Sequence, residues 1–522
     1  MNNPLYAYYT YAVIALSLTF IFILIFNDKF LNKFDSRISS FKSNHANIIL
    51  LLIVISFGYQ LHALWKEVLF WDINSYLIVA QDILRGNIPY EFQWENKGPL
   101  LFYIFSIPLL IDEANFLLAK LFSDIIFSLV VINLYFLTYK FSKNKIYSFL
   151  ASLFFILLTS VSALFHPGWS ELYVLFFLST AINIYLQVSE TNKNNLYLTI
   201  GFLLSCCLFV SMSSFLLIAF LISYIIFDEK FNKKVVLNLF FGGVIPVTIF
   251  FIIYAHRGML YELIQAMIII PFDYTKYNPG FHINFFELQS ILFSYFQNDR
   301  LWPIFFVIIF SILNFFNLKY LKSRHTKFNF IFCLIIVSII IFLSGTGYFH
   351  HAFYILYFVS ASFIFLNNKL VKNISSILIL STFLITFPHL FKSSINNIGN
   401  INNLEYPVYK EFVEIKNTYN FDSVLALQDF IFLFYANLPN SSYFAHPGIY
   451  TFDSFTKELS KNVSISQISI EEIILEQPDI IICGDLIKKE TCKDLEENNY
   501  YFSYTPKYIS SKVFLRNSIS SK

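Results

Sequence analysis

The stretch ANIILLLIVISFGYQLHALW, residues 46–65, is apolar on every side of the helix that it would form. At a rise of 1.5 Å per residue, about 20 residues cross the ~30 Å hydrocarbon core of a bilayer. A helix on the surface of a soluble protein needs only one apolar stripe. The stretch therefore predicts a transmembrane helix, and KLFSDIIFSLVVINLYFLTY (120–139) predicts a second.

Similar segments recur along the whole chain of 522 residues, which is 57% hydrophobic and only 13% charged. Soluble domains carry about 25% charged residues. Nothing in the net charge of +2 or in the distribution of basic residues indicates nucleic-acid binding. We expect an α-helical polytopic membrane protein with about twelve spans. The predicted spans are 6–26, 47–65, 115–139, 146–164, 171–188, 196–210, 212–227, 235–254, 302–318, 328–345, 352–366 and 373–390.

The region 196–227 is open to two interpretations, either two short helices or one long tilted helix. Three serines, Ser211, Ser213 and Ser214, mark the expected break between two helices.

The basic residues in the loops predict the orientation, because cytoplasmic loops are enriched in lysine and arginine. One set of loops holds 17 of these residues and the opposite set holds 6. We therefore place the first set in the cytoplasm, and the loops 66–114, 165–170, 255–301 and 346–351 outside. The basic residues of the first set are Lys29, Lys33, Arg37, Lys42, Lys140, Lys143, Lys145, Lys193, Lys230, Lys233, Lys234, Lys319, Lys322, Arg324, Lys327, Lys369 and Lys372.

The outer loop 66–114 contains two further apolar segments. INSYLIVAQDILRG (73–86) has the spacing of a helix with one apolar face. GPLLFYIFSIPLLI (98–111) is too short to span the bilayer, and its length suits an interfacial or re-entrant helix.

The tail from residue 391 onward is much more polar, with 12 of the 36 basic and 16 of the 34 acidic residues. DSVLALQ (422–428) and DIIICG (479–484) have the pattern of buried strands. We expect a membrane domain at 1–390 and a small extracytoplasmic α/β domain at 391–522. Cys483 and Cys492 both lie in this tail, but their spacing alone does not predict a disulfide.

Two acidic residues at the outer boundary are candidates for catalysis. Asp72 follows a span, and a general base there could meet a substrate in the lipid and another in water. Glu171 begins a later span on the same side, close to Trp169. Structural roles remain open for both, because Asp72 could cap a helix beginning at Ile73 and Glu171 could interact with a helix dipole.

Lys97 and the pair His350–His351 are candidates for binding a phosphate. Alternatively, Lys97 has no role in binding, and its long side chain only places its ammonium at the membrane surface. The histidine pair invites a metal interpretation, but side chains of adjacent helical residues point about 100° apart and rarely bind one ion. We therefore predict no metal ligands here, although the sequence does not exclude a divalent metal. His256, Arg257 and Asp273 are weaker candidates in the outer loop 255–301.

The stretch WDINSYLIVAQDILRGNIPYEFQWENKGPLLFY (71–103) resembles the first outer loop of bacterial C-type glycosyltransferases, the group of protein O-mannosyltransferases and the lipid A aminoarabinose transferase. The resemblance also extends to Glu171, to the step Tyr348–His351 and to the polar tail. Two features depart from it: Ala352 stands where a tyrosine is usual, and Met212–Ser213 where a lysine is frequent. The matching positions in the first loop are Asp72, Gly86, Pro89, Tyr90, Trp94, Lys97, Pro99 and Leu100.

The resemblance implies transfer of a sugar, with inversion, from a polyprenyl-phosphate donor to a lipid, glycan or protein acceptor at the outer face of a bacterial inner membrane. It implies that Asp72 is the general base and that Glu171 orients the acceptor or Asp72. Lys97 and His351, with Arg85 in reserve, are expected to bind the donor phosphate. The residues expected to line the substrate path are Tyr76, Tyr90, Trp94, Trp169 and His350. No cofactor is required.

Three rival functions were weighed against this interpretation. A transporter or flippase of lipid-linked sugars should carry ionisable residues near the middle of the bilayer and repeated halves, and neither is evident. A polysaccharide polymerase or ligase should have arginine-rich outer loops, but these contain only Arg85, Arg257 and Arg300. A non-catalytic assembly or receptor protein leaves the ordered pattern from Asp72 to Lys97 unexplained.

Overall fold

The structure is a computed structural model of the full chain. It describes residues 44–64, 71–159, 168–191, 195–271, 326–344, 349–366, 371–384, 406–445, 477–484, 495, 500–504 and 511–517.

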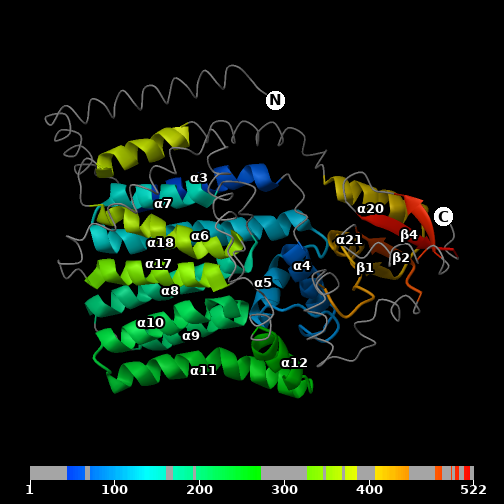
Figure 1. Ribbon diagram of the computed structural model, residues 1–522, viewed down its shortest axis with the longest axis horizontal. Coiled ribbons are helices and arrows are strands. Elements are labelled where there is room, and N and C mark those ends of the chain that lie inside the picture. Colours follow the sequence, from blue (N-terminus) through cyan, green and yellow to red (C-terminus); the bar gives the residue numbers. More distant parts are fainter. Residues whose placement is uncertain are drawn as a thin grey trace.

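Long apolar helices lie side by side and form the larger part of the structure (Figure 1). They overlap the predicted segments in position, except that 6–26 and 302–318 lie outside the described residues. Among the described residues, three helices are long and apolar enough to cross a membrane: Phe116–Ser142, Ser170–Val188 and Lys233–His256. The full set is α3 (His45–Leu64), α6 (Phe116–Ser142), α7 (Lys145–Thr159), α8 (Ser170–Thr191), α9 (Leu196–Val210), α10 (Phe215–Asp228), α11 (Lys233–His256), α17 (Thr326–Ser344), α18 (Ala352–Ser362) and the helix Val371–Leu384.

The region 196–227 forms two helices, which decides between the two interpretations of its sequence. The backbone of Ser211 is extended and ends α9, and a short 3-10 helix, η1 (Met212–Ser214), then leads into α10. An extended serine stops the helix because its backbone leaves the helical conformation.

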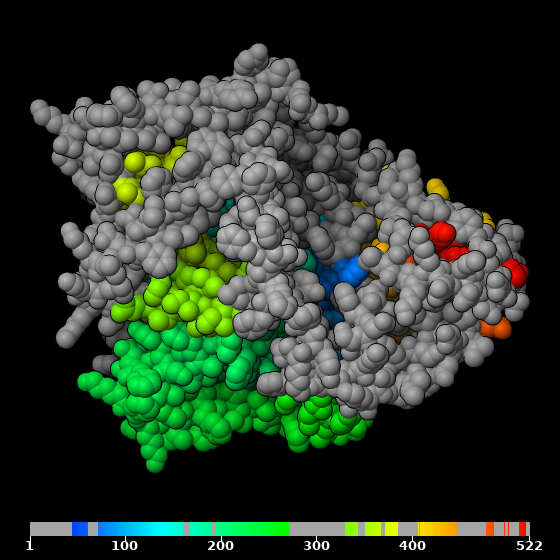
Figure 2. All heavy atoms as spheres, in the orientation of Figure 1, coloured from blue at the N-terminus to red at the C-terminus, as the bar shows by residue number. Residues whose placement is uncertain are grey.

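Glycines allow α9 and α11 to approach closely. A Cβ atom added to Gly201 would lie 2.1 Å from the carbonyl oxygen of Leu239, and one added to Gly242 would lie 1.9 Å from that of Leu198. Close approach through small residues is a common way for membrane helices to associate. The outer side of α11 exposes large apolar side chains, including Phe240, and it forms one continuous face with α10 (Figure 2).

The two apolar segments of the first outer loop form short helices, α4 (Trp71–Leu84) and α5 (Pro99–Leu109). Because α4 begins before Ile73, Asp72 lies in the first turn and is not the N-cap, which corrects the structural role considered from the sequence. With 11 residues, α5 is too short to span a bilayer, as expected. Both helices lie between the long helices and the C-terminal sheet (Figure 1).

The tail contains a four-stranded sheet in the order β1-β2-β4-β3. Strands β1 (Val424–Ala426) and β2 (Ile480–Cys483) are the two strands predicted from the sequence, and they pair in parallel. The sheet is completed by β4 (Lys512–Arg516), antiparallel to both β2 and β3 (Tyr500–Tyr504). Helices α20 (Pro407–Thr418) and α21 (Ile431–Ala436) accompany it, and Cys483 is disulfide-bonded.

Candidate active site

The start of α8 and a short 3-10 helix, η3 (Phe349–His351), bring distant polar residues together. The Oε1 atom of Glu171 lies 3.3 Å from Nδ1 of His351. Glu171 is fully buried, and its other carboxylate oxygen accepts a hydrogen bond from the Ser170 hydroxyl. A buried carboxylate needs such partners, because burial of an unpaired charge is costly.

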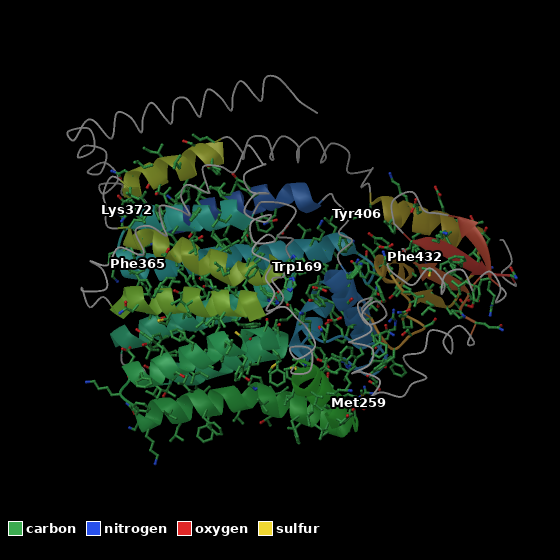
Figure 3. All side chains as sticks on the ribbon, viewed as in Figure 1. Trp169, Met259, Phe365, Lys372, Tyr406 and Phe432 are labelled. Carbon is green, nitrogen blue, oxygen red and sulfur yellow. The ribbon has the colours of Figure 1, made fainter. Side chains whose placement is uncertain are left out.

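His350 extends this polar cluster toward Trp169. The two rings stack with their centroids 4.6 Å apart and an angle of 19° between their planes. Burial lowers the pKa of the His350 imidazole to about 4, although the charge of Glu171 acts in the opposite direction. His350 is therefore neutral at pH 7. Figure 3 shows Trp169 at the end of the helices that faces the tail, whereas Phe365 and Lys372 lie at the opposite end.

Tyr76 joins α4 to the same cluster. Burial, followed by the charges of Asp72, Glu95 and Glu171, raises the pKa of the Tyr76 hydroxyl well above its usual range. The hydroxyl therefore stays protonated within electrostatic reach of three carboxylates. Glu95 was not among the candidates chosen from the sequence, although it stands two residues before Lys97 and is itself buried.

Lys97 reaches the cluster from the loop between α4 and α5. Its positive charge acts on both Glu171 and His350. The main chain beside it is held closely, because Gly98 donates its N–H to the carbonyl oxygen of Val210 at the end of α9. The structure thus brings Asp72, Lys97, Glu171, His350 and His351 together at one end of the helices.

Three predicted site residues lie in other positions. The Tyr90 hydroxyl donates to the carbonyl oxygen of Lys97 at 2.5 Å, so it supports the Lys97 loop. Trp94 is buried against Phe444 of the tail. Arg85 lies at the other end of α4, about 20 Å along the helix from Asp72. There it contacts Asp82 and donates to the side chain of Asn437 in the tail.

Arg257, one of the weaker candidates of the outer loop 255–301, has partners other than the cluster. Arg257 donates to the carbonyl oxygen of Gly86 and lies 3.6 Å from the carboxylate of Glu91. Asp273 lies outside the described residues.

Glu171, His350 and His351 form a group that could hold a metal ion. One ligand atom from each lies within 4.8 Å of the others, and all three residues are buried. Two imidazoles and one carboxylate are a donor set that suits Zn²⁺ and leaves a coordination position open. From the sequence we predicted no metal ligands at the histidine pair, because the side chains of adjacent helical residues point about 100° apart. The third candidate ligand is a carboxylate from a helix 180 residues earlier.

Comparisons with known proteins support the fold. No family model matches the chain, and no curated protein sequence is similar to it. The chain is similar to the crystal structure of ArnT from Cupriavidus metallidurans bound to undecaprenyl phosphate, with 10% identity, a TM-score of 0.56, and coverage of 91% of this chain and 98% of that one. It also matches an Archaeoglobus fulgidus oligosaccharyltransferase in complex with Zn and sulfate, with 12% identity, a TM-score of 0.43, and coverage of 90% and 73%. The likeness to ArnT over nearly the whole length of both chains shows that this chain has the C-type glycosyltransferase fold that its first outer loop predicts.

Proposed function

We propose that this chain is a membrane glycosyltransferase that moves a sugar from a polyprenyl-phosphate donor to an acceptor of the cell envelope. The observation that carries the proposal is the convergence of Asp72, Lys97, Glu171 and the histidine pair from four separate segments. ArnT, which has the same fold, is bound to undecaprenyl phosphate in its crystal structure, and this supports a lipid-phosphate donor here.

Asp72 is the general base in this proposal. It lies in the first turn of α4 and is half-buried, so an acceptor can reach it. Its carboxylate accepts the proton from an acceptor hydroxyl or amine as that group attacks the anomeric carbon. The bond from the anomeric carbon to the phosphate oxygen breaks, and attack from the opposite side inverts the configuration at that carbon.

Lys97 stabilises the phosphate that leaves. Its ammonium can donate to phosphate oxygens, and a charge-assisted hydrogen bond is about twice as strong as a neutral one. This contact gains strength as negative charge develops on the departing oxygen, which is how such donors accelerate a reaction. Two hydrogen bonds hold the main chain of Lys97 in place for this role. The Lys97 carbonyl oxygen accepts from the Tyr90 hydroxyl, and the N–H of the next residue, Gly98, donates to α9.

Glu171, His350 and His351 would hold a divalent cation. A bound cation would supply positive charge next to the donor phosphate. Without an ion, the contact between Glu171 and His351 still fixes both side chains beside the first turn of α8.

The site faces the exterior in this proposal. The loops that carry Lys97, Glu171 and His351 belong to the set that is poor in basic residues. The disulfide of Cys483 supports the same side for the tail, because disulfides persist in oxidising compartments such as the periplasm.

A deletion strain tests the proposed function directly. Mass spectrometry of its surface glycans and glycolipids should show the loss of one sugar, and the wild-type gene should restore it. A strain that loses no sugar refutes the proposed function.

The variant Asp72→Asn tests the role of the base in the same strain. Restoration should fall by at least about 100-fold, the lower range for loss of a general base. Asp112→Asn is the matched control, because Asp112 is exposed in the same outer loop and the side-chain oxygen of asparagine can still accept from the Ala114 N–H. Near-normal transfer by Asp72→Asn overturns the assignment of Asp72.

A further inference from the structure

The C-terminal tail contacts the first outer loop through the segment 440–445. The main-chain N–H of Trp94 donates to the carbonyl oxygen of Tyr443 at 2.7 Å, and the main-chain N–H of Ala445 donates to the carbonyl oxygen of Trp94 at 3.0 Å. These bonds form a parallel bridge between Trp94 and Phe444, whose rings also pack edge to face. Two main chains that lie about 350 residues apart in sequence are thus paired three residues before Lys97.

Asn440 fixes this segment to the sheet of the tail. Its side-chain carbonyl accepts from the Ala426 N–H at 2.9 Å, and its amide donates to the carbonyl oxygens of Ala426 and Phe444. Ala426 belongs to β1, so the segment moves with the sheet. The side chain of Gln93 donates in turn to the carbonyl oxygens of Asn440 and Ser442.

Tyr443 links the tail to the main chain of Lys97 through one intermediate residue. Its hydroxyl donates to the carbonyl oxygen of Tyr90 at 2.6 Å. The hydroxyl of Tyr90 donates to the carbonyl oxygen of Lys97 at 2.5 Å. Tyr90 has a φ of 72°, a conformation that is unfavourable for a residue with a side chain and persists only where the surroundings hold it.

A second group of contacts joins the tail to the far end of α4. The Gln81 side chain donates both to the carbonyl oxygen of Phe434 and to that of Glu113. Asn437 accepts from Arg85 and donates to the carboxylate of Glu113. The tail therefore contacts the first outer loop at two places, near Lys97 and at the C-terminal end of α4. These two contacts restrict rotation of the tail relative to α4.

We propose that the C-terminal domain is a positioning element of the transfer site, with Tyr443 as the positioning residue that acts through Tyr90 on Lys97. The proposal rests on the proposed function, in which Lys97 binds the donor phosphate. In this proposal the tail holds the main chain of the loop in the conformation from which Lys97 extends.

The test uses the full-length protein in lipid nanodiscs, with undecaprenyl phosphate as the probe. Tyr443→Phe removes the hydroxyl and keeps the ring. We expect it to weaken binding of undecaprenyl phosphate about fivefold, the value of one hydrogen bond between neutral groups. Tyr500→Phe is the matched control, because its hydroxyl also donates to a main-chain carbonyl, that of Pro478, but within the tail. The control should bind as the wild type does.

A double variant distinguishes positioning from general destabilisation. If Tyr443 acts through Lys97, then Tyr443→Phe has no further effect on binding in a Lys97→Met background. Hydrogen exchange adds a readout that is independent of the ligand: the amide of Trp94 should exchange about fivefold faster in Tyr443→Phe and at the wild-type rate in Tyr500→Phe.

Unchanged binding by Tyr443→Phe, or an equal loss in the two backgrounds, overturns the positioning proposal. Failure of the wild type to bind undecaprenyl phosphate, or wild-type affinity in Lys97→Met, instead overturns the phosphate role of Lys97. In that case the exchange rate decides the structural part, because a wild-type exchange rate of the Trp94 amide in Tyr443→Phe shows that the Tyr443 hydroxyl does not stabilise the contact between the tail and the loop.

Discussion

Gly98→Ala should impair transfer strongly, because the added methyl group has no space. A Cβ atom at this position would lie 2.1 Å from the carbonyl oxygen of Phe209 and 2.4 Å from its carbon. The backbone of Gly98 is extended, with a φ of −68° that any residue can adopt, so the cost is steric and not conformational. An ordinary contact begins near 3.4 Å, and the loop must therefore move away from α9 by about 1 Å.

The magnitude follows from the position of Lys97 beside this glycine. If the ammonium of Lys97 moves from about 4 Å to about 5 Å from the donor phosphate, the interaction weakens by about 0.8 kcal/mol at an effective dielectric constant of about 20. That is about fourfold. Misplacement by about 1 Å can cost as much as about 100-fold when it also disturbs the reacting geometry. We therefore expect a loss in kcat/KM of between about fourfold and about 100-fold.

The assay is transfer by the purified protein in nanodiscs, with the sugar donor that the deletion strain identifies. Gly243→Ala is the matched control, because its Cβ atom would meet only the carbonyl oxygen of Gly201, at 3.7 Å. It lies in α11, where alanine is favoured over glycine. Wild-type kcat/KM in Gly98→Ala refutes the idea that the contact between this loop and α9 positions Lys97.

Two further predictions concern the metal ligands and the helix packing. The purified protein should bind one Zn²⁺ per chain in calorimetry, and Glu171→Gln should weaken that binding by at least about tenfold, whereas equal affinities would show that Glu171 is not a ligand. Gly201→Ala should lower the unfolding temperature, because overpacking against the carbonyl oxygen of Leu239 costs about 1–3 kcal/mol. Gly243→Ala on the neighbouring helix should leave that temperature unchanged or raised, and an equal fall in both variants would contradict the packing argument.

The helices and the two predicted strands follow from local patterns. Continuous apolar runs form helices in a bilayer, where every main-chain polar group must be satisfied within the segment. The break at Ser211 and the short α5 were also visible in the sequence. The N-cap role considered for Asp72 was wrong, because an N-cap depends on a main-chain conformation that the sequence does not specify.

The convergence of the site was predicted only in part. Asp72, Glu171 and His351 were candidates because each lies beside a predicted span on the same outer side. Glu95 lacked any such signal, since an acidic residue in a polar loop is common. The contact of Trp94 with Phe444 joins segments 350 residues apart, and no local pattern encodes it. The tail could therefore be predicted as a domain but not as a neighbour of Lys97.

The charges of the cluster connect these findings. Asp72, Glu95 and Glu171 all act on the Tyr76 hydroxyl, and the charge of Lys97 acts on Glu171 and His350. A donor phosphate adds further negative charge, and each like-charge pair at about 6 Å costs about 3 kcal/mol at an effective dielectric constant of about 20. A divalent cation held by the carboxylate of Glu171 and two imidazoles would add positive charge and reduce that repulsion. The proposed function therefore predicts that a donor phosphate binds this cluster more tightly when the ion is present.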